Sequence, residues 1–152
     1  MFYKQKKKII YFHLGGLGDS IHDLSVLSQL LEEFPEGHIY YICNKFGKAI
    51  LKNSQYWEKI NIITIDKKKD FIWAIFKAPF KADLFIVCCG SNILKVNILK
   101  IFLFPRFSGA SIPDYPNPKL INFWTKASTF NVLLQPIKGA HMALAQRYAQ
   151  NP

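Results

Sequence analysis

Short apolar runs alternate with helical patterns along the first two thirds of the chain. After the strand-like run at residues 9–12, apolar positions from Ile21 to Phe34 recur at spacings of three and four residues, which predicts a helix beginning at Asp19 or Ser20. Further apolar runs predict strands over residues 38–43, 60–65, 82–89 and 106–110, and the segments between them predict helices over 46–53, 70–77 and 92–104. This alternation favours an α/β fold, a Rossmann-like parallel sheet flanked by helices.

The last third of the chain is harder to interpret. Pro113, Pro116 and Pro118 predict a loop, and apolar residues between Lys119 and Ile137 follow no clean period. A final helix is expected over residues 141–150. With 152 residues, the chain fits one domain over 1–152, and two full domains would be cramped.

The glycine-rich turn between the first strand and the first helix carries the candidate chemistry. Ligands of open α/β sheets gather at the carboxyl ends of strands, where Asp19 follows Gly15, Gly16 and Gly18. Asp19 could be a helix cap, as could Asp23 in the same region, because a carboxylate accepts backbone N–H bonds there. Asp19 could instead be a general base, with His22 three residues later orienting it or contacting substrate.

The glycines also raise the alternative of an adenine-dinucleotide-dependent oxidoreductase domain. Gly16 and Gly18 have the first spacing of the G-x-G-x-x-G fingerprint, but Ile21 stands where the third glycine belongs. The end of the second strand, residues 43–45, offers no acid for a ribose hydroxyl. A P-loop is excluded because the G-x-x-x-x-G-K-S/T pattern does not occur.

The charge balance indicates an anionic partner. Lys and Arg number 20 against 10 for Asp and Glu, so the chain carries a formal charge of +10. Nucleic acid is not expected, because no helix-turn-helix, RNP or zinc pattern occurs. An aromatic segment, residues 71–80 with Lys77 and Lys81, could anchor the chain at a membrane interface or simply pack on the sheet.

The remaining composition points to a cytoplasmic protein without a metal or a resident cofactor. Cys43, Cys88 and Cys89 form no C-x-x-C pair and are expected to be reduced thiols. The lysines at residues 4–8 precede an apolar run that the glycine turn interrupts before a signal sequence is complete. No apolar stretch reaches the ~18–20 residues that a membrane span needs.

The opening of the chain resembles the ADP-heptose:lipopolysaccharide heptosyltransferase family. Residues 14–24, LGGLGDSIHDL, are similar to the family's L-G-x-x-G-D turn, and residues 31–35, LEEFP, to its E-x-F-P helix end. Weaker similarities follow at residues 82–87, ADLFIV, and at His141 with residues 146–148, QRY.

This resemblance implies the amino-terminal, acceptor-binding half of a GT-B glycosyltransferase, with the carboxyl-terminal donor-binding domain absent. Asp19 matches the family's catalytic base, which accepts a proton from an acceptor hydroxyl during inverting transfer from ADP-heptose to an anionic glycolipid. The glycines would keep the turn open to the acceptor. His13 stands where the family usually has Arg and, when protonated, could contact an anionic acceptor. Lys95 lies near a basic position after the fourth strand and is a further candidate for substrate binding.

The resemblance leaves an alternative of another class, a catalytically silent binding module derived from the same family. The transferring enzyme implies a lipopolysaccharide-core acceptor, and the binding module implies an anionic glycolipid or another partner bound without turnover. Association with the inner face of the cytoplasmic membrane is open for both. The transferring enzyme also needs a nucleotide-sugar donor held by a second domain. Which sugar is donated and which hydroxyl accepts it do not follow from the residues.

Overall fold

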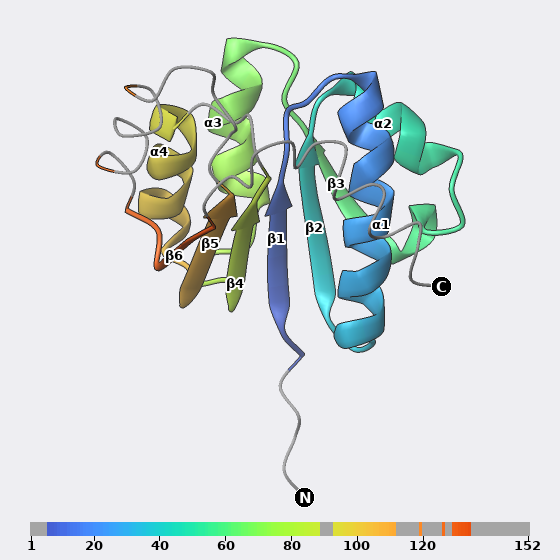
Figure 1. The fold of residues 1–152 in the computed structure, drawn as a ribbon, viewed down its shortest axis with the longest axis horizontal. Coiled ribbons are helices and arrows are strands. Elements are labelled where there is room, and N and C mark those ends of the chain that lie inside the picture. The colour runs from blue at the N-terminus through green and yellow to red at the C-terminus, as the bar shows by residue number, and fades with distance from the viewer. Residues whose placement is uncertain (1–5, 89–92, 112–118, 120–125, 127–128, 135–152) are drawn as a thin grey trace, which may run out of the picture.

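The structure is a computed structural model, and it describes residues 6–88, 93–111, 119, 126 and 129–134. Within these residues the chain forms one parallel sheet with helices on both faces (Figure 1). The predicted α/β, Rossmann-like architecture is confirmed. The expected helix over residues 141–150 lies outside the described residues.

The sheet has six parallel strands in the order β3-β2-β1-β4-β5-β6. Their bounds are β1 Lys8–Phe12, β2 His38–Cys43, β3 Ile60–Thr64, β4 Leu84–Val87, β5 Phe107–Ser111 and β6 Val132–Leu134. The central strand β1 is buried on both faces from Ile9 to Phe12, which explains its uninterrupted apolar sequence. The last strand, β6, falls in the segment whose apolar residues follow no clean period.

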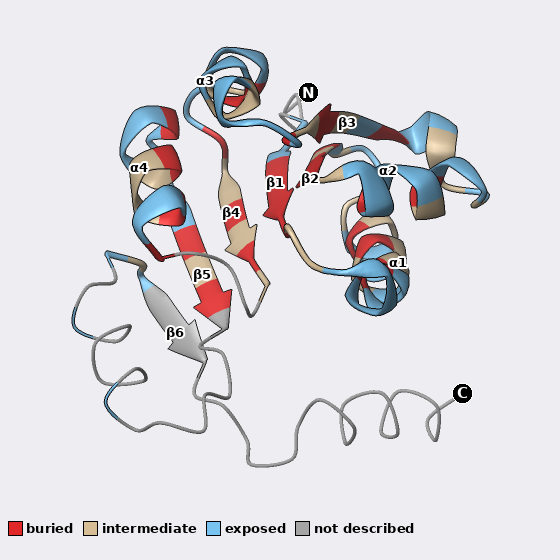
Figure 2. Cartoon of the chain, turned by 90° about the horizontal axis from the view of Figure 1, so that it is seen from above, coloured by how far each residue is buried: buried red, intermediate tan, exposed pale blue. Residues whose placement is uncertain are grey.

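Four α-helices and one short 3-10 helix connect the strands. Their bounds are α1 Leu17–Glu33, α2 Lys45–Lys52, the 3-10 helix Trp57–Lys59, α3 Lys68–Lys77 and α4 Ile93–Leu103. Two buried apolar clusters form the core. One lies between the sheet and the helices α1 and α2, and the other lies between the opposite face of the sheet and the helices α3 and α4. Figure 2 shows the sheet between these two helical layers. The described helices include none with the length and apolar character of a membrane span.

The strand order defines where a ligand would bind. β2 and β3 extend the sheet from β1 in one direction, and β4, β5 and β6 extend it in the other. In doubly wound folds, ligands bind outside the carboxyl ends of the strands where the order reverses. Here that point lies between β1 and β4, and the glycine turn follows directly from β1.

Candidate functional site

The glycine turn enters α1 through a cap made by Asp19. Gly16 is the N-cap residue, and its backbone N–H donates to Oδ2 of Asp19 at 3.1 Å. The carboxylate also lies in the first turn, where the helix dipole favours a negative charge. Asp19 is nevertheless exposed, and its Oδ1 accepts no hydrogen bond from a described residue. Asp19 can therefore cap α1 through Oδ2 while its Oδ1 is available to accept a proton.

Gly15 lies between the ring of His13 and Asp19. A Cβ at Gly15 would overlap the His13 ring and lie 2.7 Å from the Cβ of Asp19. A contact under 3.0 Å requires something to move, so a side chain at this position would displace one of the two neighbours. Glycine therefore lets the imidazole approach the base closely.

Beneath the turn, Asp23 is the centre of a buried hydrogen-bond network. The residue is 2% exposed, and its carboxylate oxygens lie 2.7 and 2.8 Å from Nδ1 of His13. The hydroxyls of Tyr11 and Tyr41 donate to its two oxygens at 2.6 and 2.5 Å. The interpretation of Asp23 as a helix cap is wrong, because its partners are side chains of β1, β2 and the residue that follows β1. A buried carboxylate needs such donors to offset its lost hydration.

The network changes the acid–base properties of its members. Burial lowers the pKa of His13, but its hydrogen bond to Asp23 and the charges of Cys88, Asp23 and Asp19 together raise that pKa above 6.5. Burial and the Asp23 carboxylate also raise the pKa of both tyrosines, so the two hydroxyls keep their protons as donors. The network thus stabilises the protonated form of the His13 imidazole and raises its pKa relative to that of a free histidine.

The raised pKa of His13 predicts a pH dependence of stability. A group whose pKa is higher in the folded than in the unfolded state stabilises the fold fully below the unfolded value, here 6.5, and this contribution is lost as pH rises through the folded pKa. We therefore expect the free energy of unfolding to decrease as pH rises from 6.5 to a value above the folded pKa. Urea titrations at several pH values measure this decrease.

Two variants test the assignment. His13→Gln should remove this pH dependence, whereas His22→Gln, at an exposed position on α1, should keep it. An unchanged pH profile in His13→Gln would assign the dependence to another group.

Residues at the ends of β2 and β4 complete the site. Asn44, after β2, donates from its side-chain amide to the carbonyl of Gly15 at 2.7 Å, and its Oδ1 caps α2. Asn44 stands where a dinucleotide-binding domain has its acid. In the described structure its side chain instead holds the glycine turn, through the bond to Gly15. Cys88, after β4, is half-buried and lies close to His13 and Asp23. Sequence reasoning missed Asn44, although an Asn before a helix is a recognisable capping signal.

His13, Asp23 and Cys88 are a conceivable metal-ligand set, since one ligand atom from each lies within 4.8 Å of the others. Both oxygens of Asp23 already accept hydrogen bonds from Tyr11, His13 and Tyr41. A metal would have to displace those donors, so the arrangement fits a hydrogen-bonded network better than a metal centre.

The other predicted site residues are only partly brought together. Gly18 lies in the first turn of α1 with open space around it, and His22 is exposed one turn further along. Lys95 is exposed on α4, which covers the opposite face of the sheet from α1. The structure therefore groups His13, Gly15, Gly16 and Asp19, and leaves Lys95 on another layer.

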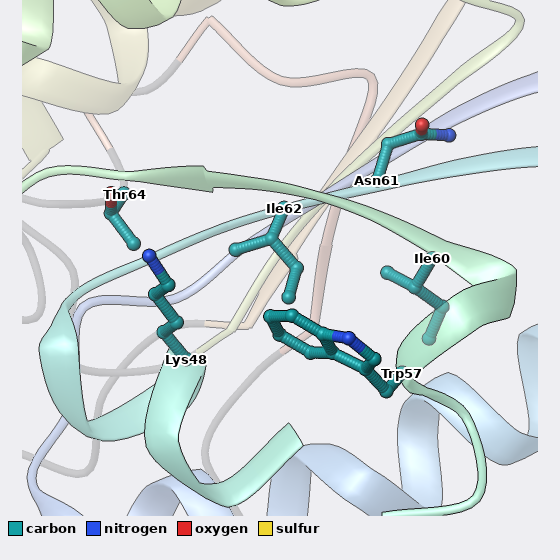
Figure 3. Close-up of a pocket in the computed structure, with 6 residues that line it drawn as sticks. All are labelled: Lys48, Trp57, Ile60, Asn61, Ile62 and Thr64. Atoms are coloured by element: carbon teal, nitrogen blue, oxygen red, sulfur yellow. The ribbon is translucent and has the colours of Figure 1, made fainter. Parts of the chain in front are cut away.

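A separate hollow lies beside the edge strand β3. Figure 3 shows Trp57, Lys48 and Ile62 around it, and its volume is about 330 Å³. Its other lining residues are Ile60, Asn61 and Thr64. The hollow contains no carboxylate among these lining residues and lies away from the glycine turn, so it is not the candidate functional site.

The fold and the turn together define a Rossmann-like domain with a carboxylate at its switch point. No family model matches the chain, and no curated protein matches its sequence. Among solved structures, the chain is similar to the crystal structure of the glycosyl transferase family 9 from Veillonella parvula DSM 2008. The TM-score is 0.56 at 14% identity, over 84% of this chain and 35% of that one. The chain thus shares a fold with about a third of that glycosyltransferase's length.

Proposed function

We propose that this chain is the acceptor-binding domain of a glycosyltransferase, with Asp19 as the general base. The observation that carries the proposal is the exposed carboxylate of Asp19 on a glycine turn at the switch point of the sheet. A general base must reach a substrate hydroxyl, and an exposed side chain beside small residues leaves room for one. The fold similarity to a glycosyl transferase family 9 structure and the resemblance of residues 14–24 support the same class.

In this reaction Asp19 accepts the proton of an acceptor hydroxyl as its oxygen attacks the anomeric carbon of the donor sugar. The new glycosidic C–O bond forms, the bond to the nucleotide diphosphate breaks, and that leaving group takes the electron pair. Holding base and hydroxyl together provides much of the rate gain. The resemblance names ADP-heptose as donor and the lipopolysaccharide core as acceptor, on the cytoplasmic face of the inner membrane. The donor site would belong to a second domain.

An anionic acceptor suits the overall charge of the chain. The whole chain carries +10, whereas His13 beneath Gly15 is paired with the buried carboxylate of Asp23. Positive charge raises the local concentration of phosphorylated or carboxylated substrates and speeds their association. It also offsets the repulsion between such an acceptor and the carboxylate of Asp19.

Gly18→Leu tests whether the turn is an acceptor site. No atom lies within 4 Å of a Cβ built at Gly18, so the substitution should preserve the fold. The larger side chain would occupy space that the acceptor needs, and we expect binding to weaken by at least about tenfold, as ~1.4 kcal/mol of lost contact produces. Calorimetric titration of the chain with a lipopolysaccharide-core acceptor measures the affinity.

Ser25→Leu is the matched control, because Ser25 is exposed on the same helix but lies farther from the turn. It should leave the affinity unchanged. Equal affinities for the Gly18→Leu variant and the unmodified chain would contradict an acceptor site at this turn.

A further inference from the structure

Large apolar side chains are exposed on the outer side of α3 and at the ends of α3 and α4. The residues Trp73, Phe76, Phe80 and Phe104 are 60%, 77%, 60% and 65% exposed. Single exposed apolar residues are ordinary, but contiguous groups mark interaction sites. Figure 2 shows that the outward sides of α3 and α4 are largely exposed.

These aromatic residues gather at one end of α3 and α4. The rings of Trp73 and Phe76 meet edge to face, with centroids 6.4 Å apart. The backbone N–H of Lys81 donates to the carbonyl of Leu103 at 2.8 Å, so the backbone segments that carry Phe80 and Phe104 lie side by side. Phe80 follows Phe76 by four residues, just beyond the end of α3. We call these residues the α3–α4 aromatic surface and define it by Trp73, Phe76, Phe80, Phe104, Lys77 and Lys81.

The backbone at this surface has an unusual conformation at two places. Lys81 has φ of 53° and Phe104 has φ of 47°, the left-handed region that non-glycine residues seldom adopt. Each residue follows the end of a helix that leads into the next strand. Residues that keep such a conformation tend to serve a function. A lysine and a phenylalanine here occupy backbone conformations that glycine adopts with less steric strain.

The charges within the surface are positive. Lys77 ends α3, and the ammonium of Lys81 lies over the ring of Phe80 at 5.7 Å. Asp83 is close to this end of the helices, but its carboxylate accepts from the backbone N–H of Lys8 and faces the guanidinium of Arg106 at 3.4 Å. Aromatic rings interleaved with lysines match an anionic lipid interface, where rings enter the headgroup boundary and lysines meet lipid charges.

We propose that the α3–α4 aromatic surface binds an anionic lipid bilayer. The interpretation of this segment as a helix packed on the sheet holds for its inner side, where Ala74 and Ala78 are buried and Phe71 and Ile75 pack against the core, but not for the exposed aromatic residues. Binding of a bilayer depends on this surface alone and does not require the proposed transfer reaction. α1 covers the other face of the sheet, so a bilayer on α3 and α4 would leave Asp19 accessible.

Vesicle flotation tests the proposal with the full chain. We expect the chain to bind phosphatidylcholine vesicles that contain phosphatidylglycerol and to bind pure phosphatidylcholine about tenfold more weakly. Phe76→Ser/Phe80→Ser should weaken binding to the anionic vesicles by at least about tenfold. The matched control, Ile21→Ser/Phe46→Ser, removes exposed apolar residues from α1 and α2 and should bind as the unmodified chain does.

A second pair of variants tests the charge. Lys77→Gln/Lys81→Gln should weaken anionic-vesicle binding about tenfold, whereas Lys48→Gln/Lys52→Gln on α2 should not. Binding should also blue-shift tryptophan fluorescence in the unmodified chain, with a smaller shift in Trp73→Phe.

Three results would overturn the proposal. These are no binding to anionic vesicles, equal binding by the Phe76→Ser/Phe80→Ser variant, and self-association in vesicle-free solution that the same substitutions abolish. The last would assign the surface to a second copy of the chain. Because these assays contain no sugar donor or acceptor, their outcome is independent of the role of Asp19.

Discussion

Asp19→Asn should lower the rate of sugar transfer by about 10²–10⁴-fold, the contribution typical of a positioned general base. The amide cannot accept the acceptor's proton, but its oxygen can still accept the hydrogen bond from the N–H of Gly16. The variant therefore separates the capping contact of Asp19 from its proposed role as the general base. The measurement is product formation from ADP-heptose and a lipopolysaccharide-core acceptor, in a preparation that includes the donor-binding domain.

The stability of Asp19→Asn is the control for its activity. If the amide oxygen keeps the bond from the N–H of Gly16, the free energy of unfolding should change by less than about 1 kcal/mol, because only the interaction of a carboxylate with the helix dipole is lost. A variant that folds normally and transfers sugar at the unmodified rate would exclude Asp19 as the base. Acceptor binding without any transfer by the unmodified protein would favour the catalytically silent module.

Asp23→Ala should destabilise the fold by about 3–5 kcal/mol, the range for removing one partner of a buried charged pair. The substitution leaves His13 and the hydroxyls of Tyr11 and Tyr41 without their acceptor in a buried environment. It also empties the volume of a carboxylate beneath the glycine turn. Urea denaturation with both fluorescence and circular dichroism measures the loss.

Milder changes keep the prediction testable if Asp23→Ala does not fold. Tyr41→Phe removes one donor and retains the ring that stacks on Tyr11, so we expect a loss of about 1.5–3 kcal/mol. Ser25→Ala, on the exposed side of the same helix, should be close to neutral. A loss under about 1 kcal/mol for Asp23→Ala, far below the cost of breaking a buried charged pair, would show that the network contributes little.

Most of the fold could be predicted because the buried strands have continuous apolar sequences. Residues 38–43 coincide with β2, and the other early elements are displaced by only a few positions. The first helix begins at Leu17, before the predicted Asp19, because Gly16 acts as its N-cap. β6 could not be predicted, since its span, Val132–Leu134, is too short to show a period.

The site could be predicted in outline but not in its chemistry. Glycine spacing locates the turn, and the position of Asp19 within it makes that residue the candidate base. Asp23 could not be assigned correctly, because its partners Tyr11 and Tyr41 lie on two strands whose pairing the local sequence does not encode. Tertiary contacts, rather than any sequence motif, distinguish the buried Asp23 from the exposed Asp19.

The Asp23 network also has a consequence for how the domain unfolds. Its carboxylate on α1 bonds to side chains of β1 and β2, so it joins three consecutive elements of one β-α-β unit. Peeling α1 from the sheet would break these hydrogen bonds together with the apolar contacts of α1, which makes partial opening costly. We therefore expect the segment from Lys8 to Cys43 to open as a single cooperative unit, and the glycine turn to keep its shape until that unit unfolds.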